Sequence, residues 1–208
     1  MEASEEPEGG RIKVLRDYDP SHQSWEKLLD PDLLRETLVR TSIYLASYEL
    51  LKSAIVDKHR YFYTAPHSCS SKDSTARAPK DRFHASCIWF RDQGALDESD
   101  LETIEKIRKH RNEIAHELPK YFSDPKFEVN MGLFDAIRLV LEKVERWWIR
   151  IEMSINPDYD QIDPYDIPDS EISSGSLIVM DLIHNVLSGQ DDDLRELLKR
   201  FRRREKDG

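Results

Sequence analysis

The feature that most constrains the fold is a long segment without helix-breaking residues. Between Asp32 and Ala65 the chain contains no glycine and no proline. Asp30-Pro31, just before it, supplies a helix N-cap and a proline suited to the first helical position. Its apolar residues recur at helical spacing and are Leu33, Leu34, Leu38, Tyr44, Leu45, Tyr48, Leu51 and Ile55. This pattern predicts one long helix from residue 30 to about residue 62.

Three further segments predict helices of the same kind. They span about 81–93, about 97–118 and about 131–155, with Gly94 ending the first of them and Pro119 following the second. Only 7 of the 208 residues are glycine, which favours a helical globule over a strand-rich one. Together with the first helix, they predict an all-α fold with a four-helix bundle over residues 30–155.

The flanks of this bundle differ from it in composition. Residues 1–29 predict an N-terminal extension that is partly disordered, with a short helical turn near Trp25. Residues 156–173 are rich in aspartate and predict an acidic, solvated linker. Residues 174–208 predict a C-terminal appendage with helices near 174–188 and 191–205 and a basic tail at Arg202–Arg204.

Composition excludes several classes of protein. The formal net charge is −10, so the chain as a whole does not attract nucleic acid, and an RNA site would have to be a local basic patch. No apolar run approaches the roughly 20 residues of a membrane span. The acidic start of the chain does not resemble a secretory signal, and two cysteines do not form a disulfide scaffold. We therefore expect a soluble, cytoplasmic protein without a membrane partner.

One cation lies on the apolar side of the predicted helix at 97–118. Counting about 100° per residue from Ile104, Arg111 falls roughly 20° from that residue, inside the stripe that faces the core. Asn112 and His116 are four residues apart and therefore share the flank of this stripe. A cation on a buried face requires an anion, a carboxylate or another subunit.

These residues resemble a known family signature. Arg111-Asn112-Glu113-Ile114-Ala115-His116 is similar to the Arg-polar-x-x-x-His motif of HEPN domains, with Asn after Arg and a small apolar residue before His. The likeness of helix layout covers roughly residues 30–155, and its specificity rests on these six residues. The resemblance implies an all-α HEPN-like bundle that forms a homodimer.

The resemblance also implies an activity, since many HEPN domains are metal-independent ribonucleases of toxin or defence type. Arg111 and His116 from two subunits would then line one cleft, with no cofactor and no metal. His116 would take the proton of a ribose 2′-hydroxyl, Arg111 would hold the scissile phosphate, and Asn112 would orient the helix ends or the imidazole. RNA, and a cognate antitoxin or inhibitor protein, are the partners this implies.

The neighbours of the motif make its helix locally basic. Arg108, Lys109 and His110 are candidate RNA-binding residues that would grip flanking phosphates. The alternative is a solvated helix face on which these cations pair with glutamates at helical spacing, such as Glu105 and Glu113.

An alternative without catalysis remains open for the motif itself. Arg111 can bridge to an internal acid, and His116 can be a helix C-terminal histidine favoured by the helix dipole. HEPN-like modules of this kind bind a nucleotide or a protein partner without cutting RNA. Related partners of nucleotidyltransferases often carry a tyrosine two residues after the histidine, and here that position is Leu118.

Three further patterns bear on function or packing: possible zinc ligands, an acidic segment and a pair of tryptophans. His67, Cys69, His84 and Cys87 are a poor match to zinc-ligand spacing, so a zinc site is disfavoured. The acidic segment at 156–173 is either a solvated linker or a shield over the basic motif helix. Trp147 and Trp148 are adjacent, so they point about 100° apart, and at least one must contact another element or subunit.

Overall fold

The computed structural model describes residues 22–64, 81–187, 195, 196 and 198. Within these residues every regular element is helical, which confirms the all-α prediction. The predicted helix at 191–205 and the basic tail lie almost wholly outside the described residues. Among the described helices, none combines the length and hydropathy that crossing a membrane requires.

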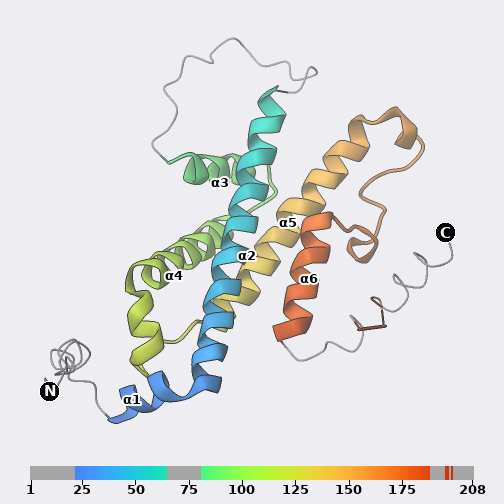
Figure 1. The fold of residues 1–208 in the computed structure, drawn as a ribbon. Helices are drawn as coiled ribbons and strands as arrows, with labels where there is room; N and C mark the ends of the chain where they lie inside the picture. Colours follow the sequence, from blue (N-terminus) through green and yellow to red (C-terminus); the bar gives the residue numbers. More distant parts are fainter. Residues whose placement is uncertain (1–21, 65–80, 188–194, 197, 199–208) are drawn as a thin grey trace, which may run out of the picture.

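The long helix predicted from the first segment is the centre of the fold. It is α2 (Pro31–Thr64), and it packs against the short α1 (His22–Leu29), α3 (Arg82–Asp92), α4 (Glu98–Ser123), α5 (Met131–Ile155) and α6 (Gly175–Leu187). In Figure 1, α2 crosses in front of α4 and α5, while α6 lies beside α5. The four predicted bundle helices are therefore α2, α3, α4 and α5.

Local sequence explains where these helices begin. The Asp81 side chain accepts a hydrogen bond from the backbone N–H of His84 and so caps α3. Asp97 and Asp100 form a reciprocal capping box at the start of α4. The Asn130 side chain accepts from the Leu133 N–H at the start of α5. Each cap satisfies N–H groups that the first helical turn leaves free.

The predicted end of α4 is wrong. The helix passes through Pro119 to Ser123, with a kink at Glu117, where φ is −113° and ψ is 21°. Proline lacks an N–H, and its ring collides with the carbonyl group four residues earlier. The chain bends to relieve this conflict and then resumes the helix, so Pro119 produces a kink in place of an end.

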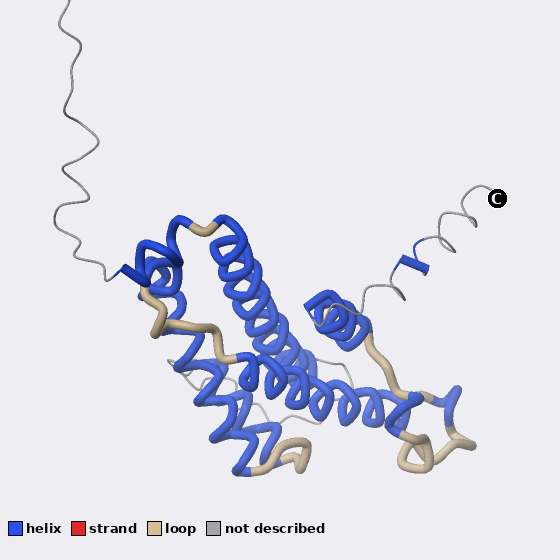
Figure 2. The backbone as a smooth tube through the Cα atoms, turned by 90° about the horizontal axis from the view of Figure 1, so that it is seen from below, coloured by secondary structure: helices blue, strands red, loops and turns tan. Residues whose placement is uncertain are grey.

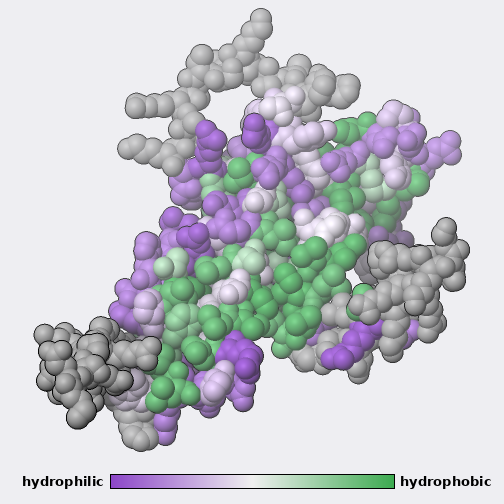
Figure 3. All heavy atoms as spheres, in the orientation of Figure 1, coloured by the Kyte–Doolittle hydropathy of each residue, from purple (hydrophilic) through white to green (hydrophobic). Residues whose placement is uncertain are grey.

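The core is formed by all five of the longer helices. Its largest fully buried side chains are Tyr44, Leu51, Ile55, Phe90, Ile107, Ile114, Tyr121, Phe134, Ile137, Leu141, Val144 and Met180. Apolar side chains also reach the surface, and Figure 3 shows them gathered over α6 and the nearby part of α2. Val39 of α2 and Val179 of α6 are 44% and 46% exposed.

The tryptophan pair contacts two different helices, as the sequence requires. The Trp147 ring lies 5.9 Å from that of Trp89 and 5.6 Å from that of Phe90, both in α3. The Trp148 ring lies 5.9 Å from that of Tyr61 in α2. The adjacent rings diverge, and each packs within this chain.

The acidic segment after α5 is mostly exposed, as expected of a solvated linker, but it is also anchored to the bundle. Arg150 of α5 donates to the backbone oxygens of Pro164 and Ile167 at 3.2 and 3.1 Å and to the Asp169 carboxylate at 2.6 Å. Pro164 is buried. The segment and α1 lie at opposite ends of the molecule (Figures 1 and 2). The contacts with α5 anchor it away from the motif, which disfavours a shield over Arg111 and His116.

Candidate functional site

The candidate site lies where α4 crosses α2. Ile104, Ile107 and Ile114 of α4 are buried, as the helical periodicity predicts. Arg111 lies at the edge of this apolar face, and its side chain is 32% exposed. The arginine therefore stands at the boundary between core and solvent, where the predicted position was the centre of the apolar stripe.

Arg111 is held by residues of α2 and by its neighbour Asn112. Its Nη2 donates to Oε1 of Glu49 at 2.8 Å, and its Nη1 donates to Oδ1 of Asn112 at 3.3 Å. Its guanidinium carbon lies 5.4 Å from the centre of the Tyr48 ring, a cation–π distance. Its Nε is buried and has no hydrogen-bond partner within the described residues. The requirement for an anion is thus met inside the chain, by Glu49.

The carboxylate that pairs with Arg111 is accessible to water. The Glu49 side chain is 47% exposed, and it also accepts a hydrogen bond from Lys52 at 3.2 Å. Partial burial opposes ionisation of Glu49, but the hydrogen bonds from Lys52 and Arg111 outweigh it and lower its pKa. Glu49 is therefore charged at neutral pH and can leave Arg111 for solvent at little cost.

The motif is only partly assembled within one chain. Arg111 and Asn112 are in contact, whereas His116, one turn farther along α4, is exposed. The imidazole of His116 forms no hydrogen bond or ion pair with any part of the chain that the structure describes. His116 stands immediately before the kink at Glu117. The geometry leaves His116 open to water and to a ligand or partner.

Arg108 and Lys109 differ in how far they are available to an anion. Arg108 donates twice to the Glu105 carboxylate, at 2.8 and 3.1 Å, and lies 3.7 Å from a carboxylate oxygen of Asp81. Lys109 is exposed. Arg108 thus follows the alternative of a paired helix face, and Lys109 remains accessible.

The contacts of His110 disfavour the prediction that it binds RNA. Its side chain is only 10% exposed. Its Nε2 accepts the backbone N–H of Asn130 at 2.9 Å, while its Nδ1 lies 3.3 Å from Glu113. The ring packs edge-on against Tyr44 at 5.0 Å. These contacts link α4 to the start of α5 and leave no nitrogen for a phosphate.

Sequence reasoning missed Glu49 and Tyr48 as parts of the site. The helical pattern placed Tyr48 correctly on the buried face of its helix, and it is 5% exposed. Nothing local identifies the adjacent Glu49 as the partner of a residue 62 positions away. Only the crossing of α2 over α4 brings these side chains together.

The disfavoured zinc site gains no support from the described residues. No group of three or more potential ligands lies together there. Cys87 is 1% exposed, and burial raises the pKa of its thiol to about 12. His84 is exposed on the same helix, and His67 and Cys69 lie outside the described residues. Cys87 is a buried apolar residue at neutral pH.

Comparisons with protein-family models, curated proteins and solved structures find no match to this chain. The functional argument therefore rests on the residues themselves.

Proposed function

We propose that this chain is a metal-independent RNA endonuclease of toxin or defence type, whose site is completed by a second copy. The proposal follows the resemblance of Arg111, Asn112 and His116 to the HEPN motif. One observation carries it. The cation of the motif is held at the surface by a half-exposed carboxylate, so a phosphate can take the place of Glu49 on Arg111.

The chemistry requires two proton transfers. The His116 imidazole of one copy takes the proton of the ribose 2′-hydroxyl, and the 2′-oxygen attacks the adjacent phosphorus. The bond to the 5′-oxygen breaks, and that oxygen takes a proton from the imidazolium of the second copy. Arg111 stabilises the negative charge that builds on the phosphoryl oxygens. The products are a 2′,3′-cyclic phosphate and a 5′-hydroxyl, so the electrons and protons balance without a metal.

Asn112 acts on Arg111 in this scheme. Its Oδ1 accepts from Nη1 of Arg111, which holds the guanidinium against α4 while Glu49 departs. Lys109 is exposed on the same helix, and Arg108 pairs with a glutamate that is 40% exposed, so both remain candidates for a flanking phosphate.

The second candidate function is a binding module without catalysis. The ion pair between Glu49 and Arg111 favours it, because the chain already supplies the anion that Arg111 needs. A module of this kind would use the exposed surface around His116 to hold a nucleotide or a protein partner. It would not require two imidazoles to meet.

Cleavage of labelled RNA by the full chain in the presence of a chelator separates the two functions. We expect His116→Ala to lower the rate by about 100-fold or more, the usual contribution of a general base. His84→Ala is the matched control, because it removes an exposed histidine from α3. Equal cleavage by wild type and His116→Ala would rule out the nuclease.

A mixing experiment tests the shared site. An excess of His116→Ala chain added to wild type should inhibit cleavage, since mixed dimers contain one intact imidazole. An excess of Arg111→Ala chain should also inhibit cleavage, whereas an excess of His84→Ala chain should not. Undiminished cleavage at a large excess of the variant would show that one copy suffices.

A further inference from the structure

One cavity, away from Arg111, has an unusual lining. It has a volume of about 450 Å³ and lies between the C-terminal part of α2 and the first turns of α3. Its lining residues are Val56, His59, Arg60, Tyr63, Arg82, Ala85 and Ser86. Among the described residues, two arginines line it and no aspartate or glutamate does.

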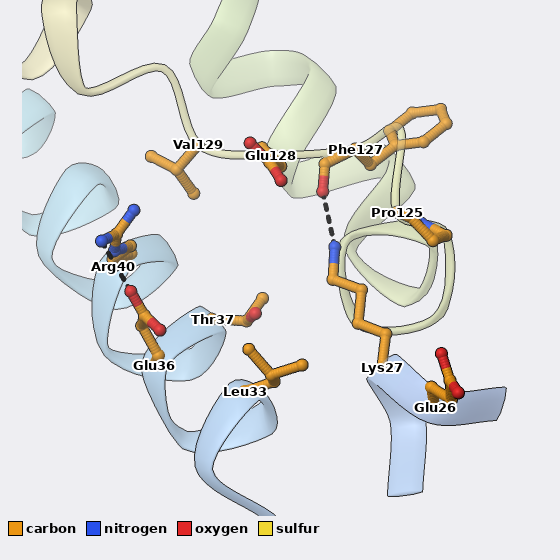
Figure 4. A pocket seen from close by; sticks show the side chains of 10 residues that line it. All are labelled: Glu26, Lys27, Leu33, Glu36, Thr37, Arg40, Pro125, Phe127, Glu128 and Val129. Carbon is orange, nitrogen blue, oxygen red and sulfur yellow. Dashed lines mark hydrogen bonds and ion pairs between the residues drawn. The ribbon is translucent and has the colours of Figure 1, made fainter. Parts of the chain in front are cut away.

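Other cavities of the molecule pair their cations. In the cavity between α1, α2 and residues 125–129, Arg40 pairs with Glu36 at 2.6 Å and Lys27 donates to the Phe127 carbonyl at 2.8 Å (Figure 4). This cavity also has a volume of about 450 Å³. Its cations are occupied by groups of the protein itself.

The same is true of two more cavities. In one of about 780 Å³ beside α5, Lys143 bonds to Asp100 at 2.7 Å and Arg150 bonds to Asp169 at 2.6 Å. In one of about 350 Å³ beside α3, Arg108 bonds to Glu105 at 2.8 Å. The cavity with Arg60 and Arg82 departs from this pattern.

Arg60 and Arg82 are exposed, and their guanidinium groups form no ion pair within the described residues. Two cationic side chains that line one cavity repel each other where their guanidinium groups come close, and an anion bound between them would remove the repulsion. The chain has a net charge of −10, so a shortage of acids does not explain why neither arginine pairs with a described carboxylate.

The remaining wall is neutral and well packed. Nδ1 of His59 lies 2.8 Å from Oγ of Ser86, which donates to the Arg82 carbonyl at 2.8 Å. The Ser86 hydrogen is thus committed, and Nδ1–H of His59 donates to Oγ. Burial lowers the pKa of His59, so a neutral ring is favoured at neutral pH. The ring lies 5.2 Å from Tyr63, whose side chain is half exposed at the cavity.

We propose that this cavity binds the phosphate group of a small phosphorylated molecule through Arg60 and Arg82, with Tyr63 beside the organic part. Two guanidinium groups offer planar donor pairs and two positive charges. A phosphate monoester carries a charge of about −1.5 to −2 near pH 7 and three acceptor oxygens. This matches the cavity better than a carboxylate, which carries a single charge.

Titration calorimetry of the full chain with phenyl phosphate, inorganic phosphate and benzoate tests the site. Phenyl phosphate supplies both the phosphate and a ring for Tyr63, and benzoate supplies the ring with a single charge. We expect phenyl phosphate to bind most tightly. The variant Arg60→Gln/Arg82→Gln should weaken its binding by about tenfold or more, from the loss of charged hydrogen bonds.

Arg35→Gln is the matched control, because Arg35 is an exposed arginine of α2 that pairs with Asp32 outside the cavity. It should bind phenyl phosphate as wild type does. Each single variant, Arg60→Gln and Arg82→Gln, should show a smaller loss, with unchanged far-UV circular dichroism. Binding unaffected by the double variant, benzoate binding as tight as that of phenyl phosphate, or no saturation by phenyl phosphate below about 10 mM would each overturn the proposal.

Discussion

In the part of the chain that the structure describes, two ion pairs join α2 to its neighbouring long helices, and they differ in how far water reaches them. Lys58 of α2 meets Glu145 of α5 at 2.8 Å, with side chains only 16% and 3% exposed. Glu49 of α2 meets Arg111 of α4, also at 2.8 Å, with side chains 47% and 32% exposed. The lengths are equal, so burial is what separates the two pairs.

Burial determines what each pair can do. Removing one partner of a buried pair leaves a charge without a counter-ion in a poorly polarisable surrounding, which is strongly unfavourable. Separating an exposed pair costs little, because water solvates both ions. The pair between α2 and α5 is therefore structural, and the pair between α2 and α4 can exchange a carboxylate for a phosphate.

The largest effect is expected at the buried pair. Lys58→Met should lower the free energy of unfolding by about 3–5 kcal/mol, because Glu145 is left buried and unpaired. Urea denaturation followed by circular dichroism measures this loss. The double variant Lys58→Met/Glu145→Leu should recover a large part of it. A single variant as stable as wild type would remove the contrast between the two pairs.

The next effect concerns His110, the residue that the sequence assigned to RNA. His110→Ala should destabilise the fold by about 2 kcal/mol, through the lost packing on Tyr44 and the lost bond from the Asn130 N–H. Lys109→Ala, the adjacent exposed cation, should change stability by less than about 0.5 kcal/mol. Thermal denaturation compares the two variants, and equal melting temperatures would contradict a structural role for His110.

A smaller change in stability is expected at the open pair. Arg111→Ala should cost less than about 1 kcal/mol, because its partner is half exposed, while under the proposed function it abolishes RNA cleavage. Loss of activity with a preserved unfolding midpoint is the signature of a functional arginine. A loss of stability comparable with that of Lys58→Met would mean that Arg111 serves the fold.

The smallest effect is a pH dependence of that same pair. The pKa of Glu49 is lowered in the folded protein, so its contribution is complete above the unfolded pKa of about 4.3 and is lost as pH falls through the folded value. The stability difference between wild type and Glu49→Gln should therefore shrink by a few tenths of a kcal/mol between about pH 6 and pH 3. A difference that grows with acidity would have the wrong sign for this pair.

Helix starts were predictable because their signals are local. Asp30-Pro31 predicted the start of α2 at Pro31, and the helix predicted at about 131–155 agrees with α5 at both ends. The tryptophan pair was equally predictable, since the 100° step between neighbours forces their rings apart. Pro119 was misjudged because a proline alone does not distinguish a helix end from a kink. The packing of Tyr121, which is 1% exposed beyond the kink, favours continuation.

What the sequence determined by itself was an all-helical chain and the placing of Arg111, Asn112 and His116 on one helix, because both follow from spacing along a single segment. What only the tertiary structure decided was which charges meet. Glu49 reaches Arg111, the Asn130 N–H donates to His110, and Arg60 and Arg82 line one cavity that no described acid shares. These outcomes depend on how the helices cross one another, and a crossing is set by side-chain packing between segments far apart in the chain.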